Sequence, residues 1–140
     1  MSEPVIEGGC LCGQVRYALR EAPFNVEYCH CGMCRKQTGA PVAGWMDVSR
    51  GALTWEAGAP SEYASSPEAR RGFCGNCGSA LSFRWLAGGD KISLALGSLD
   101  HPGRFPPTQH IYHADKVPWL ELADDLPRHG AGAPEPGPGG

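Results

Sequence analysis

The amino-acid sequence predicts a mainly β protein, built from several small antiparallel sheets with one or two short helices. Two observations lead to this class. Apolar residues come in short runs separated by turn-forming residues, which include 20 glycines and 13 prolines among 140 residues, and this spacing favours strands over helices. Seven cysteines also fall into three close groups, which predicts that metal ions tie the small sheets together.

Five segments have the clearest strand pattern. They are residues 15–19, 42–48, 53–56, 81–85 and 92–96. In the first of them Val15, Tyr17 and Leu19 recur at every second position, which is the period at which strand side chains share one face. Only residues 34–38 and 119–125 have a helical pattern, and both segments are short.

The length favours one domain, which we expect to span residues 1–128. Beyond it, residues 129–140 consist largely of Gly, Ala and Pro and offer almost nothing apolar to bury. The composition therefore predicts a disordered tail.

Charge and hydropathy exclude several classes of partner. The net charge is -3, the pI is about 5.9, and the only adjacent basic pairs are Arg35-Lys36 and Arg70-Arg71. Zinc modules that bind nucleic acid usually present a basic stripe, so no nucleic-acid partner is expected. No segment approaches the ~18 apolar residues of a membrane span, and no membrane partner is expected. The start of the chain lacks a secretory signal pattern, and we expect a cytoplasmic protein.

The cysteines form a pair, a cluster of three and a second pair. They are Cys10 and Cys12; Cys29, Cys31 and Cys34; and Cys74 and Cys77. An odd number of closely spaced thiols in a reducing compartment favours zinc over disulfides. A structural zinc takes four protein ligands, whereas a catalytic zinc takes three and leaves one position open. Seven cysteines therefore match two zinc ions, one of each kind.

Strand geometry favours one division of these ligands. Residues i and i+2 of a strand face the same side, so Cys29 and Cys31 can point two sulfurs at one ion, and Cys34 lies within reach. The four remaining thiols would then form the closed site. A rival pairing joins Cys31 and Cys34 to Cys74 and Cys77 as a zinc ribbon, but the intervening stretch is much longer than the usual ~15–20 residues.

Histidines are weaker candidates. His30 lies between two of these cysteines, so its side chain is expected to point away from the ion that they would share, as an exposed residue or one that supports the ligands from behind. Among the histidines outside the cysteine groups, His110 is the candidate for a position near the open zinc, although a surface or structural role is the default for each of them.

Three sequence blocks and a closing stretch carry a family resemblance. The blocks are residues 9–17 (GCLCGQVRY), 29–41 (CHCGMCRKQTGAP) and 73–81 (FCGNCGSAL), and the closing stretch contains residues 110–112 (HIY), 116–119 (KVPW) and 125–127 (DLP). Together they resemble the glutathione-dependent formaldehyde-activating enzyme family, also called the centromere protein V family, over about residues 5 to 129.

The resemblance implies an Mss4-like fold of coiled β-sheets. It also implies a structural zinc on Cys10, Cys12, Cys74 and Cys77 and a catalytic zinc on Cys29, Cys31 and Cys34. The implied activity is that of a carbon–sulfur lyase, in which a small thiol such as glutathione combines with an aldehyde to give an adduct of the S-hydroxymethylglutathione type. Arg35 and Lys36 follow the three-cysteine group directly, and either could bind a carboxylate of the thiol substrate or be a solvated surface charge.

Two other functions are compatible with the same residues. One is a non-catalytic interaction module in which both zinc ions are structural. The other is a thiol carrier or redox sensor in which Cys29, Cys31 and Cys34 form reversible bonds to a low-molecular-weight thiol.

Overall fold

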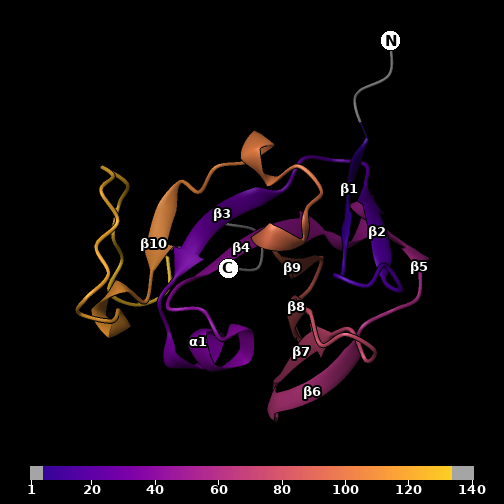
Figure 1. Cartoon of the computed structure of the whole chain (residues 1–140), viewed down its shortest axis with the longest axis horizontal. Helices are drawn as coiled ribbons and strands as arrows, with labels where there is room; N and C mark the ends of the chain where they lie inside the picture. Colours follow the sequence, from indigo (N-terminus) through magenta and orange to yellow (C-terminus); the bar gives the residue numbers. More distant parts are fainter. Residues whose placement is uncertain (1–4, 134–140) are drawn as a thin grey trace.

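The computed structural model describes residues 5–133, which form two β-sheets and one α-helix (Figure 1). A three-stranded sheet has the order β1-β2-β5, and a seven-stranded sheet has the order β10-β3-β4-β9-β8-β7-β6. The strands are β1 Ile6–Gly9, β2 Arg16–Leu19, β3 Phe24–Cys29, β4 Ala43–Ser49, β5 Leu53–Ala57, β6 Ser61–Ser66, β7 Ala69–Phe73, β8 Ala80–Trp85, β9 Lys91–Ala95 and β10 Gln109–Ile111. The helices are α1 Gly32–Thr38 and the short 3₁₀ helices η1 Arg50–Ala52, η2 Leu96–Ser98, η3 Pro102–Arg104 and η4 His113–Asp115.

Strand pairing places β10, from late in the sequence, beside β3, from the first third of it. All described pairings are antiparallel except that of β10 with β3, where His110 is opposite Tyr28 and Ile111 is opposite Cys29. In Figure 1, β10 lies at the edge of the large sheet beside β3, and the yellow C-terminal segment folds back next to it. The parallel pairing brings a late segment of the sequence directly alongside the second cysteine group.

The main core joins the two sheets. Tyr17 of the small sheet and Met46 and Leu94 of the large sheet are fully buried in one apolar cluster. Trp55 packs edge-on against Tyr17, with ring centroids 5.8 Å apart. Burial of this apolar surface is the main stabilising contribution in the absence of metal.

The mainly β class is confirmed, and each of the five predicted strands overlaps an observed one. The other five strands were not predicted. The sequences of β6 and β7, SEYASS and ARRGF, lack the alternation of apolar and polar residues that identifies a half-buried strand. Pairing makes them strands: β7 pairs with β8, and β6 pairs with β7 at the edge of the sheet.

The first predicted helix is confirmed as α1, which begins two residues earlier than expected. The Cys31 thiol caps its first turn by accepting a hydrogen bond from the Cys34 amide at 3.3 Å. Gly39, in the left-handed region with φ 74°, ends it.

The second predicted helix, residues 119–125, is wrong, because these residues have no helical conformation. Their carbonyl groups bond to side chains instead: the Lys116 ammonium donates to the carbonyl of Leu120, and the Arg128 guanidinium donates to that of Leu122. Trp119, at the start of this segment, is 73% exposed.

Ordered structure extends past the predicted start of the tail at residue 129. The amide of His129 donates to the carbonyl of His110 at 2.9 Å, and the amide of Tyr112 donates to the carbonyl of Ala131 at 2.8 Å. The rest of the predicted tail, residues 134–140, lies outside the described residues.

Candidate metal centres

Four thiols meet where the turn between β1 and β2 approaches the turn between β7 and β8. The sulfurs of Cys10, Cys12, Cys74 and Cys77 all lie within 4.8 Å of one another. Cys10 and Cys12 are 3.6 Å apart, and Cys12 is 3.8 Å from Cys74 although 62 residues separate them in the sequence. We refer to this group as the four-thiol cluster.

Hydrogen-bond donors surround the sulfurs of the four-thiol cluster. The amides of Asn76 and Cys77 each approach the Cys74 sulfur at 3.4 Å. The Ser79 hydroxyl lies 3.1 Å from the Cys77 sulfur, and this contact lowers the pKa of the Cys77 thiol to about 5. Gly78, with φ 82°, closes this turn as only glycine does without strain. Donors of this kind favour thiolates, which are the form that zinc binds.

Three more thiols form a second cluster at the end of β3 and the start of α1. Cys29, Cys31 and Cys34 have sulfurs within 4.8 Å of one another, and the Cys29 and Cys34 sulfurs are 3.3 Å apart. Cys29 and Cys34 are buried, and Cys31 is half-buried. The N-cap geometry of α1 sets the position of Cys31 relative to Cys34. We refer to this group as the three-thiol cluster.

Proton sharing makes this cluster acidic. Hydrogen bonds from Cys29 and Cys34 lower the pKa of the Cys31 thiol to about 2, and the same contacts raise the pKa of the Cys29 thiol. Among the three thiols, Cys31 therefore ionises most readily, and hydrogen bonds from its two neighbours stabilise the negative charge of its thiolate.

Arg71 is the cation that faces this charge, and the sequence alone did not single it out. It comes from β7, its side chain is buried, and its Nη1 atom lies 3.7 Å from the Cys34 sulfur and 2.9 Å from the Gln37 amide oxygen. Its guanidinium also stacks over the Phe83 ring at 4.8 Å. The only sequence signal was its membership of an adjacent basic pair, which does not reveal which arginine points inward.

The two basic residues expected at this site have different positions. Arg35 donates from Nη1 to the backbone carbonyls of His30 at 2.6 Å and Asp115 at 2.7 Å, and so links the cysteine segment to η4. Lys36 instead lines a surface groove of about 520 Å³ together with Arg71 and Tyr63. The groove therefore runs from the solvent toward the residue that contacts the three-thiol cluster.

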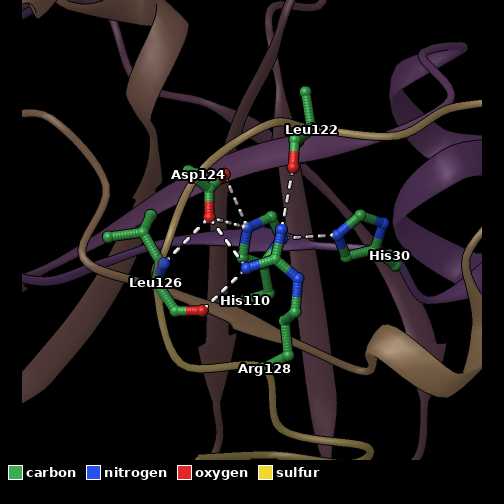
Figure 2. A network of polar contacts seen from close by, with 6 residues as sticks. All are labelled: His30, His110, Leu122, Asp124, Leu126 and Arg128. Atoms are coloured by element: carbon green, nitrogen blue, oxygen red, sulfur yellow. Dashed lines mark hydrogen bonds and ion pairs between the residues drawn. The ribbon is translucent and has the colours of Figure 1, made fainter.

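His30 does not group with the three thiols and instead contacts His110. It is buried, not exposed, and its Nε2 atom lies 2.9 Å from Nδ1 of His110. Figure 2 shows that His110 in turn contacts Asp124, which Arg128 also holds. His110 is thus connected to the cysteine segment through His30.

Comparisons with known proteins agree with this arrangement. The family model described as "Glutathione-dependent formaldehyde-activating enzyme" matches residues 5–115. The chain belongs to this family. The match covers both thiol clusters, and membership confirms the resemblance and the Mss4-like class that it implied.

Two individual proteins extend the comparison. A protein of Schizosaccharomyces pombe described as an uncharacterized lyase is 35% identical over 86 residues, which is 61% of this chain and 61% of that protein. The crystal structure of a Rhodobacter sphaeroides protein matches with a TM-score of 0.53 at 22% identity, covering 67% of this chain and 87% of the other. The second comparison supports the fold alone.

The donor sets of both clusters fit zinc. Groups of four and three thiols with sulfurs within 4.8 Å correspond to the closed and open ligand sets of zinc proteins. The rival ribbon pairing does not match the structure, because Cys31 and Cys34 group with Cys29.

Within residues 5–133, no helix is long and apolar enough to cross a membrane.

Proposed function

We propose that the chain is a zinc-dependent carbon–sulfur lyase that joins a small thiol to an aldehyde, and splits the adduct, at the three-thiol cluster. The observation that carries this proposal is the group of three converging thiols beside a buried arginine and an accessible groove. The family description names glutathione and formaldehyde, and the related yeast protein is described as a lyase. Glutathione with formaldehyde is therefore the substrate pair that we propose.

Two zinc ions have different tasks in this proposal. Cys10, Cys12, Cys74 and Cys77 would hold a structural ion, and Cys29, Cys31 and Cys34 would hold a catalytic one. Bound zinc lowers the pKa of a thiol that reaches its open position, which supplies a nucleophile at neutral pH. Reduced thiols are needed for both sites, which is the reason to propose a cytoplasmic location.

The reaction itself is an addition. The thiol gives up its proton, a sulfur electron pair forms the bond to the carbonyl carbon, and the π electrons of the carbonyl move to oxygen, which takes up a proton. The product is a hemithioacetal, in which sulfur carries a hydroxymethyl group, and the reverse reaction breaks the same carbon–sulfur bond. No oxidant or reductant is consumed.

Residues of the chain supply charge balance and orientation. Arg71 lies 3.7 Å from the Cys34 sulfur and offsets the negative charge of three thiolates and a substrate thiolate. Lys36, on the wall of the groove, is placed to attract a carboxylate of the thiol substrate. Arg35 supports the site through backbone carbonyls, which makes it a positioning residue in this proposal.

An exchange measurement by NMR tests the proposal. Glutathione and formaldehyde also form their adduct without a catalyst, so the test is whether zinc-loaded protein increases the exchange rate between free and adduct signals above this background. Cys34→Ser protein should lose this increase while keeping its fold. Equal exchange rates with and without the wild-type protein, for glutathione and for other small thiols, would refute the lyase assignment and favour the non-catalytic module.

A further inference from the structure

Three imidazoles come together beside the end of β3, in a group separate from the three-thiol cluster. His30 follows β3, His110 lies on β10, and His113 begins η4. One ring nitrogen of each lies within 4.8 Å of the others, and the ring centroids are 5.1 to 5.6 Å apart. His30 is 2% exposed and His110 is 1% exposed. Three buried or half-buried imidazoles that meet at one point are unusual among structural histidines.

Asp124 fixes the tautomer of His110. Its two carboxylate oxygens each lie 3.1 Å from His110 Nε2, while the Leu126 amide and the Arg128 guanidinium donate to the same carboxylate (Figure 2). An ionised carboxylate only accepts, so His110 carries its proton on Nε2 and presents a lone pair on Nδ1. A carboxylate that orients a histidine from behind is the usual support of a metal ligand.

An unusual backbone conformation brings the third imidazole to this point. Tyr112 has φ 52° and ψ 36°, a left-handed conformation that residues other than glycine rarely adopt. Hydrogen bonds hold it there: the Tyr112 amide donates to Ala131, and the His113 amide donates to His129. The turn directs His113 back toward His110, only three residues earlier.

We propose that His30, His110 and His113 form a third, all-nitrogen site for a divalent cation such as Zn²⁺. Three neutral imidazoles with an open fourth position are an established zinc ligand set. Without a cation, a proton on His30 Nε2 bridges to His110 Nδ1 at 2.9 Å. The cation takes the place of that proton, which moves to Nδ1 of the same ring, so the ligand lone pairs face the ion and no net proton is released.

Local charges permit a cation here. Apart from Arg35, whose guanidinium donates to backbone carbonyls, the basic side chains near the three histidines are Lys116 and Arg128. Each forms an ion pair, Lys116 with Glu121 at 2.7 Å and Arg128 with Asp124 at 2.8 Å. The site does not depend on the proposed lyase activity, because it uses none of the seven cysteines.

Zinc stoichiometry with matched histidine variants tests the site. Wild-type protein is loaded with excess zinc, dialysed, and its bound metal counted by mass spectrometry. His113→Ala should bind one zinc ion fewer per chain, whereas His101→Ala, which removes an exposed histidine outside the group, should match the wild type. Cys34→Ser should lose the three-thiol zinc and keep the histidine-bound one, so failure of either site is seen separately.

A second measurement needs no variant. Zinc is titrated into wild-type protein whose cysteine sites are already filled, and the imidazole ¹⁵N resonances are recorded. Binding should shift His110 Nδ1 and His30 Nε2 and leave His110 Nε2 protonated. Unchanged histidine resonances, together with equal zinc counts in the wild type and His113→Ala, would overturn the proposal and leave a purely hydrogen-bonded network.

Discussion

The two cysteine clusters use the same ligand atom in opposite surroundings. The four-thiol cluster joins two turns whose cysteines are at least 62 residues apart, and amides and a serine hydroxyl approach its sulfurs. The three-thiol cluster draws all its ligands from six consecutive positions and has Arg71 and a groove beside it. Ligand number and sequence separation are the reasons why we propose a role in folding for the first cluster and a role in chemistry for the second.

The largest expected effect is on stability. In our proposal Cys74 is one ligand of a zinc ion that closes a long loop, so Cys74→Ser protein should lose on the order of 5 kcal/mol of unfolding free energy or fail to fold. Cys34→Ser, the matched change in the three-thiol cluster, should cost much less. Thermal unfolding of both zinc-loaded proteins checks this, and equal losses would contradict the division of roles.

Chelation should separate the clusters next. The four-thiol ion has a complete shell of protein ligands, whereas the three-thiol ion has an open position at which a chelator can attack. Native mass spectrometry of the wild type during treatment with a chelator should show the ion of the three-thiol cluster leaving before that of the four-thiol cluster. Cys34→Ser protein, which should lack the three-thiol ion from the start, identifies that step by its absence. Retention of this ion after the four-thiol ion has gone would reverse the assignment.

Much of the difference between the two clusters could be predicted from the sequence, because the spacing of the cysteines within each group is a local property. The cysteine groups, α1 and the five alternating strands all follow from patterns within a few residues. Arg71 was missed because its burial depends on the pairing of β7, a strand without an apolar pattern. The histidine group was missed for a related reason: β10 pairs in parallel with β3, and no short-range signal shows that His110 lies beside His30.

Arg71 allows a smaller and more specific test. Arg71→Met keeps the length of the side chain but removes the charge that faces Cys34, so the catalytic rate should fall by roughly 10- to 100-fold, as expected for loss of one charge-assisted hydrogen bond. Arg70→Met is the matched control, since the Arg70 guanidinium donates to the carbonyls of Ser66 and Ala69 instead. Similar rates for the two variants in the glutathione–formaldehyde exchange assay would remove Arg71 from the site.

The hydrophobic core contains no residue of either cluster, and its buried Tyr17 gives a test of how stability changes at high pH. Burial raises the pKa of Tyr17 to about 12, while its hydroxyl contacts Ser98 at 2.6 Å. Because the pKa is higher in the folded state, this contribution to stability is complete below about pH 10 and is lost as the pH rises toward 12. Urea unfolding should therefore show a weaker decline over this range for Tyr17→Phe than for the wild type. A parallel decline would assign alkaline unfolding to other groups.

The most direct test of the central claim is cobalt substitution followed by addition of a thiol. Cobalt bound by thiolates has strong charge-transfer absorption, so each cluster reports on its own ligand set. The account predicts that glutathione changes the absorption of the three-thiol cluster, leaves that of the four-thiol cluster unaltered, and has a weaker effect on Cys34→Ser protein. A wild-type spectrum that is indifferent to every thiol tried, or one in which both clusters respond alike, would contradict the distinction between a closed and an open centre.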